Sequence, residues 1–248
     1  MPLSGEGSSR TFRQNVTLAV LLASVAGAVN AVGFFVLGTH TSHMSGHVAE
    51  LGEALGTGEF ALAKTAVGWV LAFVGGAATA SVMVELGRRR LRRGRYVAPL
   101  ALEAVILVWV AAVAVKGSLS QRDALAALLA FAMGMQNALV TRISNAVIRT
   151  THLTGVLTDI GIGLVSLISW FRLHREVLGE EGGFFASLRR AEPLRNLWLH
   201  FALLSSFVAG AAVGPVLLHA WDARALSLPV AGLLLLIALD LRTVRQPG

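Results

Sequence analysis

A polar motif occurs twice in this chain of 248 residues, which is otherwise rich in apolar segments. Residues 41–55 read TSHMSGHVAELGEAL, residues 150–164 read TTHLTGVLTDIGIGL, and five of the fifteen aligned positions are identical. Six more positions are conservative, and Glu50 aligns with Asp159. A polar motif repeated between apolar segments is typical of a membrane protein built from two related halves, with its site where the halves meet.

Two further stretches extend the repeat on both sides of the motif. AGAVNA at 26–31 matches MGMQNA at 133–138, and FVGGAATASV at 73–82 matches FVAGAAVGPV at 207–216 with six of ten residues identical. Each half therefore has the order apolar segment, motif, apolar segment, apolar segment. Since the first apolar segment belongs to the repeat, we expect it to be retained rather than cleaved as a signal peptide.

The composition agrees with a protein that crosses the membrane several times. Hydrophobic residues make up 55% of the chain, charged residues 14%, and the mean hydropathy is +0.68, which is typical of polytopic membrane proteins. The net charge of +7 lies largely in short loops such as RRRLRRGR at 88–95, so we expect contacts with lipid headgroups and none with nucleic acid. The absence of cysteine excludes disulfides and thiol chemistry.

Six segments are long and apolar enough to cross a bilayer about 30 Å thick, which requires about 20 helical residues. They are residues 16–38, 63–86, 97–116, 123–141, 197–219 and 226–242. Two further helices carry the motif, at 44–57 and 153–171. The first of these is too short and too polar to span. The second is long enough, so its topology has to be decided by the distribution of basic residues.

Basic residues collect on the cytoplasmic side of membrane proteins. If both motif helices enter and leave on one side, 17 basic residues lie inside and 4 outside; if only the second spans, the split is 11 to 10, and if both span it is 12 to 9. We therefore predict an all-α integral membrane protein with six transmembrane helices, arranged as a 3+3 inverted-topology repeat, and two re-entrant half-helices that meet near the bilayer midplane. The predicted regions are a cytoplasmic tail at 1–15, a first repeat at 16–117 and a second repeat at 118–245, which includes a cytoplasmic loop at 172–196.

The two motif helices are expected to form an anion site. Hydroxyl side chains of the types that cap helix N-termini precede each of them, and two facing N-termini offer free N–H groups and partial positive charge. Glycine in each copy leaves room for a backbone or a solute. The expected solute-binding residues are Thr41, Ser42, His43, Ser45, Gly46, Thr150, Thr151, His152, Thr154 and Gly155. The alternative for the hydroxyls is hydrogen bonding between helices.

Ionisable and polar residues inside the apolar segments are further candidates, because such groups are costly in a membrane. Glu50 and Asp159 are expected in the walls of the site, where they carry protons or bond neighbouring helices. Glu103, inside the third span, is either a proton relay or a partner of the arginines at 88–95; the pairing is preferred. Asn30 and Asn137 are expected to pack helices or to line a pore.

No cofactor or metal is expected. His43, His47 and Glu50 could share one helical face and hold a metal, but the second motif has Val156 where His47 stands, so no symmetric second site exists. The sequence contains no dinucleotide or nucleotide motif and no GxSxG elbow. We therefore expect that the protein is not an enzyme.

Three motifs of this chain resemble those of a known family. They are Gly27 to Ala31, Met44 to His47 and Arg149 to Gly155, and they are similar to segments of the YoaK-like family of bacterial membrane proteins (domain of unknown function 1275). The resemblance covers about residues 15–245. The family often has Asp at the position of Asn30 and Asn at that of His47. The resemblance implies a bacterial inner-membrane location but no activity.

The repeat and the topology together predict a secondary transporter or channel for a small solute, with an anion preferred. The alternatives are a non-transporting membrane scaffold or sensor, and a metal or cation transporter. The expected partners are the lipid bilayer and a small-molecule or ion substrate, and the sequence leaves homo-oligomerisation open. The protein is expected to be a multi-pass protein of the inner membrane with both termini in the cytoplasm.

Overall fold

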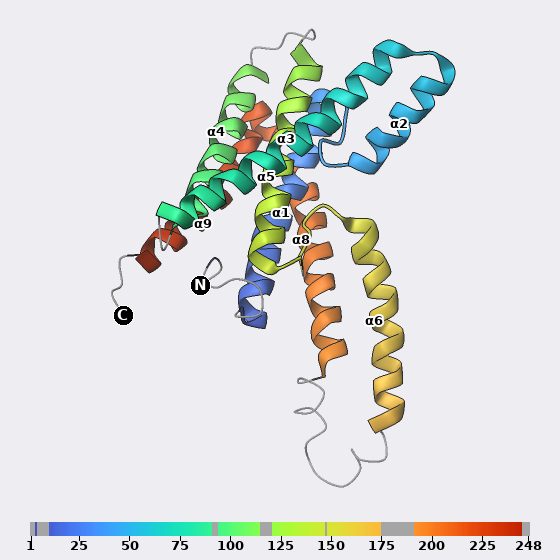
Figure 1. Cartoon of the computed structure of the whole chain (residues 1–248), viewed down its shortest axis with the longest axis vertical. Helices are drawn as coiled ribbons and strands as arrows, with labels where there is room; N and C mark the ends of the chain where they lie inside the picture. Colours follow the sequence, from blue (N-terminus) through green and yellow to red (C-terminus); the bar gives the residue numbers. More distant parts are fainter. Residues whose placement is uncertain are drawn as a thin grey trace.

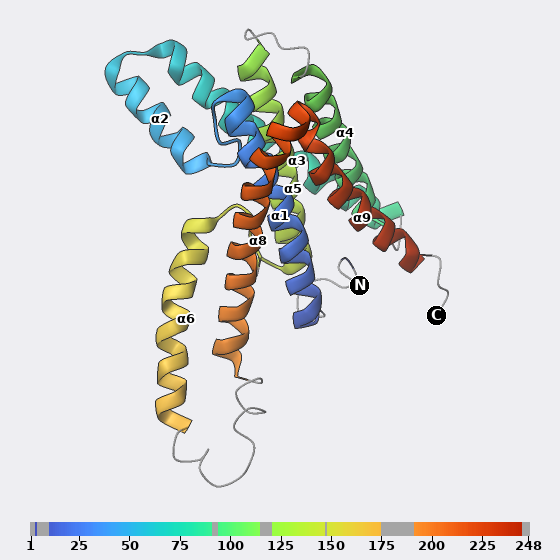
Figure 2. The same ribbon diagram turned by 180° about the vertical axis from the view of Figure 1, so that it is seen from behind.

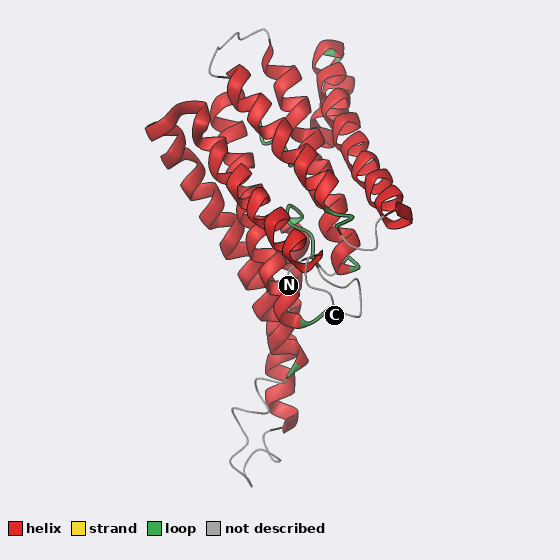
Figure 3. Cartoon of the chain, turned by 90° about the vertical axis from the view of Figure 1, so that its left-hand side faces the viewer, coloured by secondary structure: helices red, strands yellow, loops and turns green. Residues whose placement is uncertain are grey.

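The apolar segments form long helices. The computed structural model describes residue 3 and residues 10–90, 94–114, 121–146, 148–174 and 191–244, and within these ranges every regular element is helical (Figures 1 and 3). The elements are α1 (Phe12–Leu37), α2 (Met44–Thr57), α3 (Phe60–Arg90), α4 (Val97–Ala114), α5 (Arg122–Ser144), α6 (Leu153–His174), α8 (Glu192–Trp221), the 3-10 helix η4 (Asp222–Leu226) and α9 (Ser227–Val244). The all-α prediction is therefore confirmed.

Seven segments of the described chain are long and apolar enough to cross a membrane: α1, α3, α4, α5, α6, α8 and the stretch Arg224–Leu241, which contains most of α9. They include the six predicted spans. The seventh is α6, which the charge distribution assigned to a re-entrant helix although its length suffices to span. The 14 residues of α2 extend only about 21 Å at 1.5 Å per residue. The predicted tail 1–15 and loop 172–196 lie mostly outside the described residues.

The helix ends differ from the predicted spans where side chains extend the helix. The first helix begins at Phe12 because Thr11 and Gln14 form a capping box: the Thr11 hydroxyl accepts from the Gln14 N–H at 3.3 Å, and the Gln14 side chain accepts from the Thr11 N–H at 2.7 Å. The third helix continues to Arg90, four residues beyond the predicted end. Arg88 and Arg89 pair with Glu85 at 3.9 and 3.7 Å, which favours the helical conformation there.

The two halves pack against each other in matching ways. The first helix of each half lies along the third helix of the other, so that α1 packs on α8 and α5 packs on α3 (Figures 1 and 2). Each motif helix lies on the third helix of its own half, α2 on α3 and α6 on α8, and α4 packs on α9. The motif helices are thus held at the edge of a central core made by α1 and α5.

Glycines allow these helices to approach closely. At four positions a Cβ atom would overlap a backbone carbonyl oxygen of the facing helix, so only glycine fits without a shift. The contacts are Gly27 with Phe207, Gly210 with Ser24, Gly134 with Phe73 and Gly76 with Phe131. The first two pairs occupy the same places in the sequence repeat as the last two.

Candidate functional site

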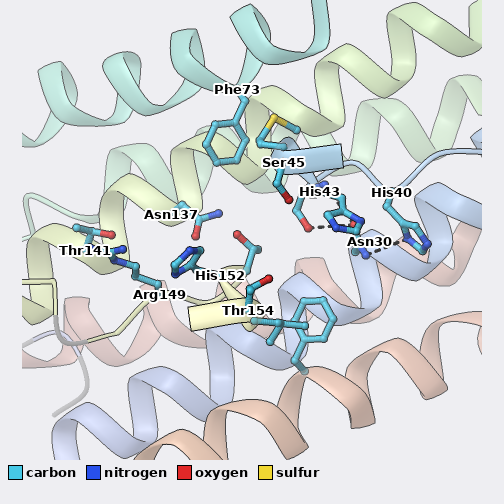
Figure 4. A pocket seen from close by; sticks show the side chains of 15 residues that line it. Asn30, His40, His43, Ser45, Phe73, Asn137, Thr141, Arg149, His152 and Thr154 are labelled. Carbon is cyan, nitrogen blue, oxygen red and sulfur yellow. Dashed lines mark hydrogen bonds between the residues drawn. The ribbon is translucent and has the colours of Figure 1, made fainter. Parts of the chain in front are cut away.

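A cavity of about 420 Å³ lies where α2 and α6 begin. The two helices start at this cavity and run away from it in opposite directions (Figures 1 and 2). Their first residues enter the cavity from two sides, with Ser45 on one side and Thr154 on the other (Figure 4). The site is therefore built from both halves of the chain.

The cavity brings together most of the residues that the repeated motif singled out. Six of the ten expected solute-binding residues line it: Ser42, His43, Ser45, Thr151, His152 and Thr154. Both asparagines of the repeat, Asn30 and Asn137, also line it. Thr41 and Thr150 are buried behind the wall, at 1% and 0% exposure. Gly46 and Gly155 are not part of the lining.

Asn30 fixes the first-half wall. Its side-chain oxygen accepts from the Ser42 N–H at 3.2 Å and from the Ser42 hydroxyl at 3.0 Å, and its Nδ2 lies 3.1 Å from His40 Nδ1. The expectation that Thr41, Ser42 and Ser45 cap the helix is therefore not met in α2. The N-cap residue is His43, whose side chain makes no capping hydrogen bond. The Ser42 hydroxyl donates to Asn30 on α1 and does not cap α2.

Asn137 plays a related part in the second-half wall. Its amide donates to the Met133 carbonyl at 2.9 Å, and its side-chain oxygen lies 3.5 Å from the Thr150 hydroxyl. The same hydroxyl lies 3.4 Å from the side-chain oxygen of Gln136, which is buried. A polar contact therefore runs from the cavity wall into the protein interior.

The motif glycines support the histidines rather than the solute. A Cβ on Gly155 would overlap the His152 ring, whereas a Cβ on Gly46 would meet the His43 ring no closer than 3.7 Å. Gly155 thus leaves space that the His152 imidazole needs, whereas the His43 ring would also fit beside a Cβ at position 46. This differs from the expectation that the glycine backbone itself faces the solute.

Arg149 supplies the positive charge of the cavity. Among the described residues it is the one arginine or lysine in the lining, and that lining contains no aspartate or glutamate. In the sequence, Arg149 stands out only as the first residue of a family motif. The repeat could have identified Arg149 as a cavity residue, since Arg149 aligns with His40 when the motif is extended by one position toward the N-terminus.

His40 also lines the cavity, in the connection between α1 and α2. Its ring stacks on Phe34 with centroids 4.4 Å apart. Burial, and secondly the neighbouring His43, lowers the pKa of His40 from its ordinary value, so the imidazole is neutral at neutral pH. The two aligned positions therefore carry different charge.

Glu50 and Asp159 do not line the cavity, in contrast to the expectation. Glu50 lies 3.4 Å from the Nδ1 of His47, a buried side chain whose Nε2 contacts the His40 carbonyl at 3.0 Å. Asp159 pairs with His200 at 3.5 Å. Both carboxylates thus bond neighbouring side chains at the back of the motif helices. Within the described part of the chain, no three His, Asp or Glu side chains gather as a metal site requires.

Glu103 is 1% exposed and sits on α4. It accepts a hydrogen bond from the Gln136 amide at 3.1 Å, and it forms no ion pair with the described arginines of the 88–95 segment. The preferred pairing with those arginines is thus not seen where the structure describes them. Because α4 packs directly on α5, the buried Glu103 side chain meets Gln136 of α5 as its hydrogen-bond partner.

Comparison with known proteins agrees with the membrane assignment. A family model described as a protein of unknown function (DUF1275) matches residues 18–239. The chain is 30% identical over 145 residues to the UPF0700 transmembrane protein YoaK of Bacillus subtilis (strain 168), which covers 58% of this chain and 64% of that protein. No solved structure matches. The family resemblance is confirmed, and the helices together with this relative identify a multi-pass membrane protein.

Proposed function

We propose that this chain, which belongs to the DUF1275 family of proteins of unknown function, carries a small anion across the bacterial inner membrane through the cavity between α2 and α6. Transport proceeds by alternating access of that one site, without a cofactor and without chemical change of the solute. The protein is a carrier and not an enzyme.

The composition of the cavity lining supports an anion as the solute. Arg149 provides a full positive charge, hydroxyls and imidazoles provide donors, and no carboxylate of the described chain lines the space. The first turns of α2 and α6 add free N–H groups and the positive ends of two helix dipoles. A cation carrier would instead need oxygen ligands with negative charge. A scaffold has no use for a cavity of about 420 Å³ into which hydroxyl, imidazole and guanidinium side chains of both halves project.

The arrangement proposed for transport is a 3+3 inverted repeat with six spans, in which α2 and α6 are re-entrant half-helices and both termini are cytoplasmic. Three observations support it: the opposite directions of α2 and α6, the matched glycine contacts between the halves, and the 17-to-4 distribution of basic residues. In such repeats the halves exchange conformations, which opens one shared site to either side in turn.

The experiment compares two arginines near the end of α5. Both side chains are exposed, but Arg149 lines the cavity, whereas Arg142, in the last turn of α5, lies outside the lining. We would measure thermal stabilisation of purified protein by sodium salts of chloride, nitrate, formate and phosphate, followed by uptake of the best anion into proteoliposomes. Arg149→Gln should weaken binding by about 1.5–3 kcal/mol, the usual value of a hydrogen bond to a charged group, or roughly 10- to 150-fold.

Arg142→Gln, which removes the same charge nearby, should bind like the wild-type protein. Equal affinity in the two variants would contradict the cavity as the anion site. A lack of stabilisation by every anion tested, with the protein folded, would contradict the anion assignment itself.

A further inference from the structure

We propose that anion binding in the cavity is linked to the uptake of one proton by Glu103. This inference rests on the proposed function and names the ion that accompanies the solute. Glu103 does not touch the cavity. It communicates with the cavity through Gln136 and Thr150, so it acts as a positioning residue and not as a ligand.

The physical basis is a row of three contacts between α4 and the cavity wall. Gln136 Nε2 donates to Glu103 Oε1 at 3.1 Å, and Gln136 Oε1 faces the Thr150 hydroxyl at 3.4 Å. That hydroxyl is also 3.5 Å from Asn137 Oδ1, which lines the cavity. Glu103, Gln136 and Thr150 are all at most 1% exposed, so water does not compete for these hydrogen bonds.

The Thr150 hydroxyl carries one hydrogen and faces two acceptors, Gln136 Oε1 and Asn137 Oδ1. Both contacts are long for a hydroxyl donor, and one hydrogen cannot serve both fully. Which acceptor receives it depends on how the Gln136 carboxamide is turned, because a rotation of 180° exchanges its donor and acceptor. The rotation in turn depends on whether Glu103 is charged.

The two states follow from donor and acceptor rules. When Glu103 is ionised it only accepts, so Gln136 turns its NH₂ toward it and its oxygen takes the Thr150 hydrogen. When Glu103 binds a proton from water, its O–H donates to the Gln136 oxygen, and the Gln136 NH₂ donates to the Thr150 oxygen. The Thr150 hydrogen then goes to Asn137 Oδ1.

The protonation state of Glu103 changes the affinity of the cavity for an anion in a definite direction. With Glu103 ionised, Asn137 Oδ1 presents an unsatisfied acceptor to the cavity, and a negative charge lies behind the wall. Both repel an anion. With Glu103 protonated, the acceptor is satisfied and the charge is gone. Anion binding therefore draws a proton onto Glu103, and by linkage a lower pH tightens anion binding.

Few charged groups compete for Glu103. The charged side chains that the structure describes on the elements packed against α4 are Lys64, Glu85, Arg88 and Arg89 on α3, Arg122, Asp123 and Arg142 on α5, Asp222 and Arg224 on η4, and Asp240 on α9. None of these forms an ion pair with Glu103 in the described structure, and Asp240 interacts with Arg95. The first half has Val29 at the position of Gln136, so the switch exists once per chain.

The matched variant is Glu103→Gln, which keeps a side chain that hydrogen-bonds Gln136 but cannot ionise. The first measurement is the infrared absorption of protonated carboxylic acids as a function of pH. Wild-type protein should show a band that disappears at high pH, and Glu103→Gln should lack it. Addition of the anion selected by thermal shift, at a fixed pH where the wild-type band is partial, should increase the band.

The second measurement is anion affinity against pH. Wild-type affinity should rise as pH falls, by up to tenfold per pH unit for one linked proton. Glu103→Gln should bind at high pH about as tightly as the wild type does at low pH. His40, His43 and His152 also line the cavity, so an unchanged pH dependence in Glu103→Gln would assign the proton to them and overturn the proposal.

A wild-type protein without the infrared band would equally overturn the proton site and leave the proposed anion transport standing. Failure of all anions to stabilise the protein would instead remove the proposed function. Glu103→Leu, which removes the hydrogen bond, separates the switch from simple helix packing. Packing alone predicts that Glu103→Leu loses stability while Glu103→Gln keeps the pH dependence of the wild type.

Discussion

Arg149 and His40 lie 109 residues apart at the same position of the repeated motif, and both line one cavity. The repeat therefore places two side chains on opposite sides of the site, but evolution of the two halves has given them different chemistry. Arginine is always charged at physiological pH, whereas His40 has a lowered pKa. The two aligned positions therefore differ in charge within one cavity.

The helix-packing glycines give the first prediction. A Cβ at Gly27 or Gly134 would overlap a carbonyl oxygen of the facing helix, so Gly27→Ala and Gly134→Ala should each destabilise the protein by about 1–3 kcal/mol. The two losses should be similar because the positions are equivalent in the repeat. The measurement is thermal unfolding in detergent, followed by circular dichroism.

Gly68→Ala is the control for this pair. Gly68 lies on α3 with open space around its Cβ position, so the alanine should be neutral or stabilising by up to about 1 kcal/mol through its helix propensity. A melting temperature of Gly134→Ala equal to that of Gly68→Ala would contradict the close contact between α3 and α5.

The second prediction separates the two motif glycines. Gly155→Ala should displace the His152 ring, since the new Cβ overlaps it, while Gly46→Ala meets the His43 ring only at ordinary contact distance. Both rings are exposed to the cavity and can rotate, so stability should change little. Anion affinity should fall in Gly155→Ala and stay near wild type in Gly46→Ala. Unchanged anion affinity in Gly155→Ala would show that the position of the His152 ring does not matter for binding.

The sequence predicted an all-helical membrane protein and six of the residues that line the cavity, because both depend on local patterns. Apolar length predicts helices, and the paired motif predicted Ser42, His43, Thr151 and His152 together. The sequence did not predict the hydrogen bonds between Ser42 and Asn30. These residues belong to two different segments, and a sequence repeat does not show how a helix is rotated toward its neighbour. For the same reason it missed the Glu103 and Gln136 pair, which depends on how α4 turns against α5.

Arg149 was missed for a different reason. An arginine next to a helix end fits the general rule for cytoplasmic loops, and that rule does not say whether its side chain points to lipid headgroups or into the protein. Glu50 and Asp159, in contrast, were expected to line the cavity and do not. Their conserved spacing in the repeat favoured the cavity, but at one to two turns into α2 and α6 they face neighbouring side chains, His47 and His200.

The third prediction tests the re-entrant topology of α6. Leu173, near the end of α6, is 78% exposed, and Glu59 lies in the turn between α2 and α3. In this cysteine-free chain, Glu59→Cys should react with an impermeant thiol reagent in intact cells, whereas Leu173→Cys should react only after the membrane is permeabilised. Asn145→Cys, between α5 and α6, is the cytoplasmic reference.

A spanning α6 would place Leu173 on the side opposite to Asn145. Labelling of Leu173→Cys from outside, with Asn145→Cys protected, would therefore exclude the inverted repeat with two half-helices.

The last prediction concerns the charge of the first-half wall. Asn30→Asp keeps an oxygen that accepts both bonds from Ser42, and the His40 imidazole can turn an N–H toward the carboxylate oxygen that replaces the amide, so the connection between α1 and α2 should stay in place. It adds one negative charge beside the cavity. At roughly 7 Å and an effective dielectric constant of about 20, that charge costs an anion about 2 kcal/mol, or roughly thirtyfold in affinity. Thermal-shift titration at constant pH measures the change.

Asn137→Asp is the matched variant in the other half, and the two should differ in stability. The Asn137 amide donates to the Met133 carbonyl at 2.9 Å, and a carboxylate would set two acceptors against each other there. We therefore expect Asn137→Asp to lower both the melting temperature and anion affinity, and Asn30→Asp to lower affinity alone. An Asn30→Asp protein with native stability and unchanged anion affinity would mean that the solute does not reach this wall, because no screening inside the protein removes a charge so close to the site.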